Sequence, residues 1–188
     1  MISKYFMLYH VYNRGAHKAL MFNDDSDYDR LLKMLYSNND KSMKQFSHRK
    51  ESELYNHERI KLVKIHAYVI MPNHFHILVE ELVKQGMYKF IHRTLTGYAM
   101  YFNKKYQHSG TIIQGIYKAK KVETIDYYFD LIKYIHENPS SIIIKNPEYF
   151  TEKERGDADF IKRFCNTYRY SSLLDFSGII RPENNILG

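Results

Sequence analysis

Runs of aromatic, β-branched and alternating apolar residues predict four strands, at residues 5–13, 61–71, 74–80 and 111–122. The second and third strands are joined by a tight turn at Pro72 and Asn73, so we expect them to pair antiparallel. Gly115 interrupts the fourth strand. Because side chains alternate along a strand, we expect Ile65 and Ala67 to share one face of the second strand.

Apolar residues at helical spacing predict three helices. The first follows a polar start signal at residues 23–26, and the second spans residues 87–106. The third begins with Asp126 as its cap and runs to about Glu137, where Asn138 and Pro139 stop it.

The resulting order is β-α-β-β-α-β-α, and its first six elements form the split βαβ pattern of ferredoxin-like folds. We therefore predict an α+β fold with a central antiparallel sheet and helices on one face, plus an additional C-terminal helix and tail. The other face of such a sheet is open for ligands. We expect a single domain over residues 1–188, with its core at about 5–139 and a C-terminal extension at about 140–188. The charged residues 38–59 predict a long loop.

Composition narrows the class of protein. The 188 residues include one cysteine, Cys165, which excludes an internal disulfide and a multi-cysteine zinc site. The first residues lack the pattern of a signal peptide, and no apolar run is long enough for a membrane helix, so we expect a cytoplasmic protein without membrane contact. A net charge of +7 weakly favours an acidic partner such as nucleic acid. The 18 tyrosines can stack on unpaired bases or simply pack in the core.

Candidate chemistry begins with His74 and His76 at the start of the third strand. Alternation places both imidazoles on one face, roughly 6–7 Å apart along the strand, while the apolar Phe75 and Ile77 point to the helices. Such a pair can share a divalent metal ion, or it can be two surface histidines. With no cysteine in range, oxygen ligands and open positions suit Mg²⁺ or Mn²⁺.

The last helix can complete such a site. Tyr134 and Asn138 lie four residues apart and therefore face the same side of the helix. Asn138 can lend its amide oxygen to a metal ion, and Tyr134 can place its hydroxyl near a bound phosphate. Without the histidine pair, the favoured interpretation is that Tyr134 is one more half-buried tyrosine and Asn138 a helix cap before proline.

Five motifs in order resemble the single-tyrosine HUH transposases, and most closely the branch of REP-associated tyrosine transposases. They are Tyr9-His10-Val11-Tyr12-Asn13-Arg14-Gly15, Met71-Pro72-Asn73-His74-Phe75-His76, Tyr101-Phe102-Asn103 with Gly110 and Gln114-Gly115-Ile116-Tyr117-Lys118-Ala119, Lys133-Tyr134-Ile135-His136-Glu137-Asn138-Pro139, and Tyr168-Arg169-Tyr170-Ser171-Ser172. The chain departs from that family at Ile116, where Arg is usual, and at Tyr170, where Trp is usual. Residues 151–166 resemble an insertion.

The resemblance implies cleavage and rejoining of single-stranded DNA, with a hairpin or palindrome as the recognised form. In that chemistry Tyr134 is the nucleophile and forms a 5′-phosphotyrosine link, while His74, His76 and Asn138 hold Mg²⁺ or Mn²⁺. Relatives of this kind are monomers or homodimers. Basic residues are candidates for phosphate contacts, although we expect at least half of them to form a solvated face: Arg14, Lys89, His92, Arg93, Lys104, Lys105, Lys118, Lys120 and Lys121.

Two other functions compete with this interpretation. A ferredoxin-like sheet can serve as a non-catalytic module that binds single-stranded nucleic acid, as in RRM domains. That alternative leaves His74 and His76 unexplained. A metal-dependent phosphodiesterase that uses water instead of Tyr134 is the third hypothesis, and it predicts hydrolysis that survives Tyr134→Phe.

Overall fold

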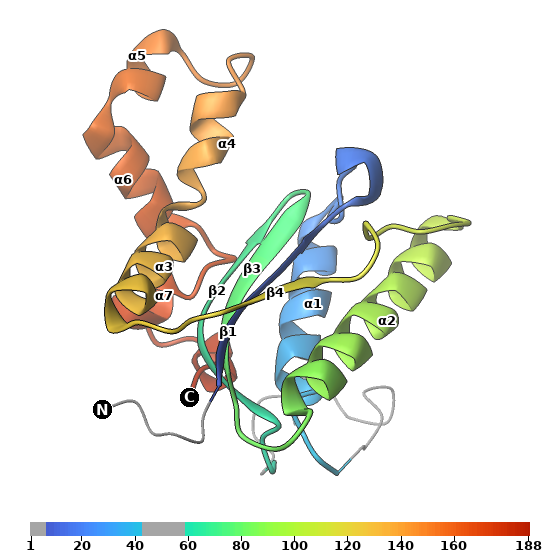
Figure 1. Cartoon of the computed structure of the whole chain (residues 1–188). Helices are drawn as coiled ribbons and strands as arrows, with labels where there is room; N and C mark the ends of the chain where they lie inside the picture. The colour runs from blue at the N-terminus through green and yellow to red at the C-terminus, as the bar shows by residue number, and fades with distance from the viewer. Residues whose placement is uncertain (1–6, 43–58) are drawn as a thin grey trace.

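A four-stranded antiparallel sheet forms the centre of the protein (Figure 1). The computed structural model describes residues 7–42 and 59–188, so most of the predicted loop at 38–59 lies outside the described residues. The strands are β1 (Leu8–Arg14), β2 (Val63–Met71), β3 (His74–Glu81) and β4 (Lys118–Lys121), in the spatial order β2-β3-β1-β4. Each neighbouring pair is antiparallel, which is the predicted ferredoxin-like arrangement.

Helices α1 (Asp25–Ser37) and α2 (Gly86–Tyr106) lie side by side on one face of the sheet, as predicted (Figure 1). Helix α1 begins at a capping box. The Asp24 carboxylate accepts a hydrogen bond from the Asp27 backbone amide, and the Asp27 carboxylate accepts one from the Asp24 backbone amide. The main core lies between these helices and the sheet, and Phe75 and Ile77 of β3 are buried in it. The alternation along β3 therefore points its apolar set at the helices, as expected.

A β-bulge in β2 makes the prediction for Ile65 and Ala67 wrong. The pairing of β2 with β3 shifts register between these two residues. The extra residue, His66, reverses the alternation. As a result, Ile65 is buried beneath α1 and α2, whereas Ala67 is buried on the opposite face of the sheet.

Helix α3 (Ile125–Glu137) covers part of that opposite face, over β2 and β3. Its buried residues Leu131 and Ile135 pack against apolar side chains of β2 and β3. The helix is capped by Thr124, whose hydroxyl accepts a hydrogen bond from the Tyr127 backbone amide, and not by Asp126 as predicted. The open part of this face is thus confined to β1 and β4.

The fourth strand is shorter than predicted. Only Lys118–Lys121 pair with β1, and Ile113 makes an isolated bridge to Gly15. Gly115 lies between these two segments with a φ of 56°, a left-handed conformation that turns the chain away from the sheet. This turn leaves Ile116 almost fully exposed.

The C-terminal part adds short helices beyond α3 (Figure 1). These are α4 (Ser140–Lys145), α5 (Glu152–Gly156), α6 (Ala158–Thr167) and α7 (Leu173–Phe176), and a 3-10 turn, η4 (Pro182–Ile186), packs on α1. A second 3-10 turn, η1 (Ala16–Lys18), follows β1. No helix in the described part of the chain is both long and apolar enough to cross a bilayer.

The Ser171-Ser172 motif attaches this C-terminal part to the free edge of β2. Ser171 bridges to Val69, and the Ser172 backbone amide donates to the carbonyl of Tyr68 at 3.0 Å. The Ser172 hydroxyl accepts from the Tyr68 amide at 2.9 Å and lies 2.9 Å from His136 Nε2 of α3. The two serines therefore connect the tail, the sheet and α3.

Candidate active site

The two histidines of the predicted metal motif face α3. His74 and His76 share their side of β3 with Leu78, which is buried under α3. The ring centroids of the two histidines are 5.2 Å apart and the planes are nearly perpendicular. Both imidazoles therefore lie between the sheet and α3, next to the residues that α3 contributes.

His74 is held at both ring nitrogens. Its Nδ1 lies 2.7 Å from the side-chain oxygen of Asn73, and its Nε2 lies 3.0 Å from the side-chain oxygen of Asn138. Burial lowers the pKa of His74, against the opposing effect of the Asn138 hydrogen bond, so the neutral ring is favoured. A neutral ring carries one proton, so His74 donates to one of the two amide oxygens and turns a lone pair toward the other. In the tautomer protonated at Nδ1, the Nε2 lone pair and the Asn138 oxygen, 3.0 Å apart, are two acceptors that fit a shared cation.

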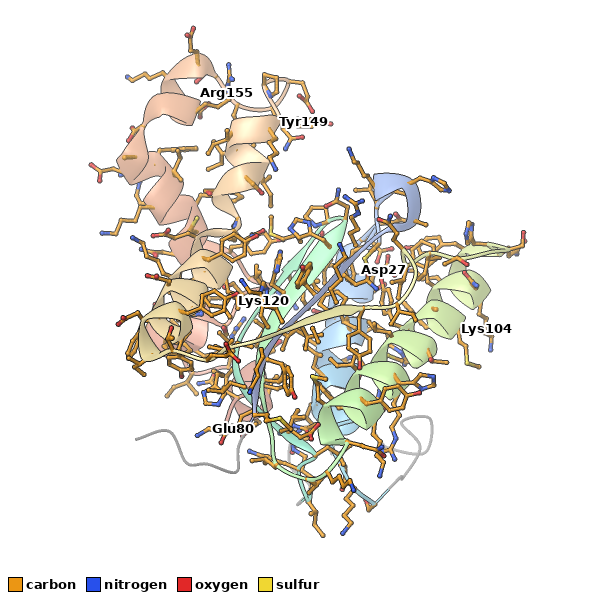
Figure 2. All side chains as sticks on the ribbon, in the orientation of Figure 1. Asp27, Glu80, Lys104, Lys120, Tyr149 and Arg155 are labelled. Atoms are coloured by element: carbon orange, nitrogen blue, oxygen red, sulfur yellow. The ribbon has the colours of Figure 1, made fainter. Side chains whose placement is uncertain are left out.

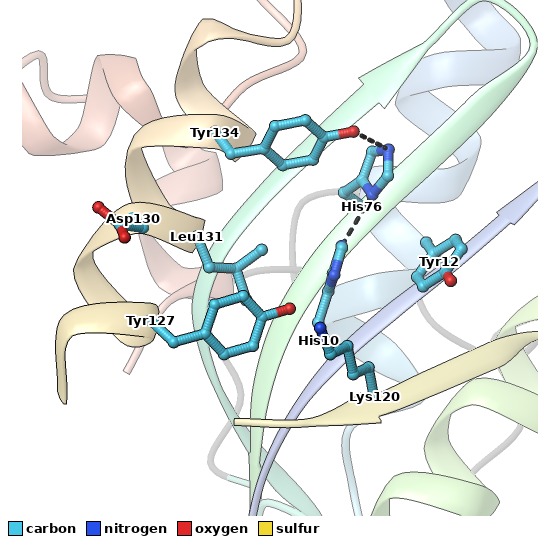
Figure 3. A pocket seen from close by; sticks show the side chains of 8 residues that line it. All are labelled: His10, Tyr12, His76, Lys120, Tyr127, Asp130, Leu131 and Tyr134. Carbon is cyan, nitrogen blue, oxygen red and sulfur yellow. Dashed lines mark hydrogen bonds between the residues drawn. The ribbon is translucent and has the colours of Figure 1, made fainter. Parts of the chain in front are cut away.

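Tyr134 lies beside the second histidine (Figure 3). Its hydroxyl is 3.4 Å from His76 Nε2, and the two rings meet edge to face. The side chain is 49% exposed, so the hydroxyl is accessible to a large substrate. The structure thus brings Tyr134 and Asn138, one helical turn apart on α3, to the two histidines of β3.

His10 of β1 is a site residue that we did not predict from its chemistry. Its Nε2 lies 2.8 Å from Nδ1 of His76, and both side chains are buried. Burial is the main cause that lowers the pKa of His10 to about 4 and that of His76 to about 3. Both rings are therefore neutral at pH 7, and one of them donates its N–H to the unprotonated nitrogen of the other. The sequence signal that could have identified His10 is its position on β1, the strand that a ferredoxin-like fold places next to β3.

A pocket of about 560 Å³ adjoins this group, between α3 and the β1–β4 side of the sheet (Figure 3). It includes the predicted residues His76, Lys120 and Tyr134. The residues added by the tertiary structure are His10, Tyr12, Tyr127, Asp130 and Leu131. The predicted site is therefore one end of a larger concave surface.

Only part of the predicted basic set shares this face of the sheet. Directly paired residues of an antiparallel sheet project to the same side. Lys118 pairs with Tyr12 and Lys120 pairs with His10, and Arg14 pairs with His74. These three basic residues therefore lie on the same face as the histidines, with the Arg14 guanidinium hydrogen-bonded to the side chain of Gln114.

Lys121 lies on the other face of β4, where it pairs with Tyr9 and its ammonium is 3.7 Å from Glu123. The other predicted basic residues lie on α2, which packs on that same far face. Figure 2 shows Lys104 on the outer side of α2, separate from Lys120 on β4. The α2 residues are Lys89, His92, Arg93, Lys104 and Lys105.

Two of these α2 residues are engaged within the protein. Arg93 donates to the backbone carbonyl of Asp40 at 2.9 Å. Lys105 forms an ion pair with Asp24 at 2.7 Å and with the buried Asp27 at 2.8 Å. Because its ammonium already compensates a buried carboxylate, we assign Lys105 to the stability of the fold and exclude it from the proposed DNA-binding surface.

Within residues 7–42 and 59–188, no group of three or more His, Cys, Asp or Glu side chains is arranged to hold a metal ion. The predicted ligand set is different in kind, because its third member is the amide of Asn138. Two imidazoles and one amide oxygen leave positions for water or for substrate oxygens, which suits a catalytic site better than a closed structural one.

Comparison with known proteins gives the family. The chain matches the model of the family described as "Transposase IS200 like" over residues 3–138. The protein belongs to the IS200-like transposase family. The match includes β1 to α3 and ends at Asn138, so it contains every residue of the predicted catalytic and metal set.

A solved structure extends the likeness of this IS200-like transposase to its tail. It is a REP-associated tyrosine transposase bound to a REP hairpin, with a TM-score of 0.52 and 11% sequence identity. The alignment covers 97% of this chain and 89% of that one. At such low identity the likeness shows a shared fold alone. No curated protein matches the sequence.

One departure from the family pattern is accommodated in the core. Tyr170, where the resemblance led us to expect Trp, is buried and stacks on Tyr28 with ring centroids 3.9 Å apart. Its carbonyl accepts a hydrogen bond from the Ile70 amide of β2. The substitution therefore leaves an aromatic ring in place between α1 and the edge of the sheet.

Proposed function

We propose that this IS200-like transposase cleaves and rejoins single-stranded DNA through a covalent link to Tyr134. The observation that carries the proposal is the position of the Tyr134 hydroxyl, 3.4 Å from His76 Nε2, at the edge of an open pocket. The neighbouring His74–Asn138 pair supplies two further groups that fit a divalent cation. A water-using nuclease does not need a tyrosine hydroxyl at this point.

The proposed reaction exchanges one phosphate ester for another. The Tyr134 oxygen attacks the scissile phosphorus, a P–O bond to tyrosine forms, and the P–O bond to the 3′ oxygen breaks. The products are a 5′-phosphotyrosine and a free 3′-OH. The tyrosine proton leaves to water, because the side chain is about half exposed, and the leaving oxygen gains a proton. Since the ester is retained, a 3′-OH can reverse the step and join new ends without ATP.

His74, His76 and Asn138 would hold Mg²⁺ or Mn²⁺ in this proposal. When bound, the cation polarises the scissile phosphate and makes phosphorus more electrophilic. The chain contributes the orientation of the ligands: Asn73 fixes the ring of His74, and His10 fixes the ring of His76. The Tyr134 hydroxyl lies 3.4 Å from His76 Nε2, so it would stand next to a cation held by that nitrogen.

The part of the sheet that α3 leaves uncovered provides a surface for the DNA strand. Arg14, Lys118 and Lys120 lie there on the same face as the histidines. The ring of Tyr12, on β1, lies on this face as well. Cations can contact phosphates, and aromatic rings can stack on unpaired bases. The similar solved structure is bound to a REP hairpin, which supports a hairpin as the substrate here.

A covalent-adduct assay tests this function. The protein is incubated with a panel of labelled single-stranded hairpins and Mn²⁺ or Mg²⁺, and then separated on a denaturing gel. We expect a metal-dependent shifted band that is absent in Tyr134→Phe and in His76→Ala, while Tyr134→Phe still binds DNA. Tyr149→Phe, at an exposed tyrosine outside the pocket, serves as a matched control that retains the band.

The two competing hypotheses give different results in the same assay. Binding without any adduct, across all hairpins and both metals, would identify a non-catalytic binding module. Cleavage that persists in Tyr134→Phe, with no covalent band, would identify a metal-dependent phosphodiesterase that uses water.

A further inference from the structure

Several residues of the pocket beside Tyr134 have no role in the chemistry described above. Tyr127 and Tyr134 are seven residues apart on α3, so they project from the same side of the helix, roughly 10 Å apart along its axis. In Figure 3 both rings extend from α3 toward the sheet, with His10 opposite them. Leu131, midway between them, contributes an apolar surface at the back of the pocket.

Two of the tyrosine rings that line this pocket, Tyr127 and Tyr12, each lie near a lysine. The ammonium of Lys120 lies 4.7 Å from the centre of the Tyr127 ring, and that of Lys118 lies 6.0 Å from the centre of the Tyr12 ring. An aromatic face offers a stacking surface to any base, and an adjacent cation offers a partner to the phosphate that the base carries. The alternation of ring and cation therefore matches the alternation of base and phosphate in a nucleotide.

The dimensions agree with this occupant. A pocket of about 560 Å³ falls within the range of small-ligand sites, and it is open to solvent and not enclosed, as a base on a continuing strand requires. Tyr127 is partly buried against the cluster under α3 and also lines the pocket, so packing restricts the motion of its ring. A held aromatic ring loses little conformational freedom when a base stacks on it.

We propose that this pocket binds an unpaired nucleobase next to the scissile phosphate, stacked on Tyr127, with Lys120 contacting the adjoining phosphate. The inference rests on the proposed function, because it takes the strand that Tyr134 attacks as its ligand. It adds a positioning role: a base held here fixes which phosphate reaches the Tyr134 hydroxyl. Tyr127 is thus assigned to substrate positioning and not to the chemical step.

Photocrosslinking tests the placement directly. The full chain is mixed, in EDTA, with a single-stranded thymidine 12-mer that carries one 5-iododeoxyuridine, irradiated, digested and analysed by mass spectrometry. We expect the crosslinked base on Tyr127. Crosslinks found solely outside the pocket, for example on α2, or no detectable binding of the 12-mer, would overturn the assignment.

Affinity measurements with matched variants separate stacking from general packing. In EDTA, Tyr127→Leu is expected to weaken binding of the 12-mer about 10-fold, whereas Tyr127→Phe retains the ring and changes affinity less than about 2-fold. Phe129→Leu removes a neighbouring aromatic ring of α3 that is 61% exposed and outside the pocket, and it should leave affinity unchanged. Equal losses in Tyr127→Leu and Phe129→Leu, or none in Tyr127→Leu, contradict the proposal.

The adduct assay distinguishes a failure of this inference from a failure of the proposed function. Tyr127→Leu should need more DNA than the unchanged protein to form the Tyr134 adduct, because the nucleophile is intact but the base is no longer held. An adduct without any dependence of affinity on Tyr127 would refute the base pocket and leave the cleavage chemistry standing. Crosslinking to Tyr127 with no adduct on any hairpin would refute the cleavage chemistry and leave a base-binding pocket.

Discussion

His10 Nε2 lies 2.8 Å from His76 Nδ1, and this contact joins two strands that are 66 residues apart in the chain. His76 presents its other nitrogen, Nε2, to Tyr134. If Nδ1 of His76 donates its proton to His10, the lone pair of Nε2 is directed toward the site. A histidine that ligates a metal ion commonly donates its second ring nitrogen to such a partner. We infer that His10 sets both the orientation and the tautomer of His76.

Removing the acceptor at position 10 should weaken metal binding. His10→Leu is expected to lower the affinity for Mn²⁺ by about 10- to 100-fold, because His76 loses the partner that fixes its tautomer. His10→Gln, whose amide oxygen can accept the same hydrogen bond, should recover much of that loss. Titration calorimetry without DNA measures this directly. Equal Mn²⁺ affinities in His10→Leu and the unchanged protein would contradict the assigned role.

The lysines of β4 are divided between the two faces of the sheet, and this division gives a second prediction. Lys118→Gln and Lys120→Gln should each weaken binding of single-stranded DNA and each reduce the slope of log affinity against log salt by about 0.7, because each removes one phosphate contact. Lys121→Gln is the matched control on the opposite face and should leave the slope unchanged. The measurement is fluorescence anisotropy at several salt concentrations. A Lys121 effect as large as that of Lys120 would reject the assigned surface.

Lys105 should matter for folding and not for DNA. Lys105→Met removes the cation that compensates the buried Asp27, which keeps hydrogen bonds from Tyr101 and Tyr106. We expect a loss of about 2 kcal/mol in the free energy of unfolding, since an uncompensated carboxylate remains in the core. Urea denaturation measures the loss. DNA affinity at a temperature where both proteins are folded should be unchanged.

Stability should fall in mild acid because of His136. Burial lowers its pKa in the folded protein from 6.5 to about 4, against a smaller opposing effect of Asp175. Below pH 6.5 the unfolded chain therefore binds more protons than the folded one, and the free energy of unfolding decreases as pH falls toward 4.

The contribution of His136 to this decrease is up to about 3 kcal/mol. It can be isolated by comparing urea denaturation of the unchanged protein and His136→Gln between pH 7 and pH 4, in EDTA. The variant should show a shallower dependence on pH, and parallel curves for the two proteins would contradict the prediction.

Much of the site was accessible from local sequence patterns. The alternation along β3 placed His74 and His76 together on the face away from the main helices, because a strand has a period of two. The spacing of Tyr134 and Asn138 placed them on one side of α3, because four residues make about one helical turn. Prediction was wrong where one residue changed the period, as at the bulge between Ile65 and Ala67.

The tertiary structure alone decided which of these groups meet. Sequence patterns determined the elements, the faces of each strand and the family resemblance, since these depend on residues close together in the chain. The contact of His10 with His76, the pairing of Lys105 with Asp27, and the pocket between Tyr127 and the sheet depend on how strands pair and where α3 docks. Those contacts join residues far apart in sequence, and they form only when the buried apolar surfaces of sheet and helices come together.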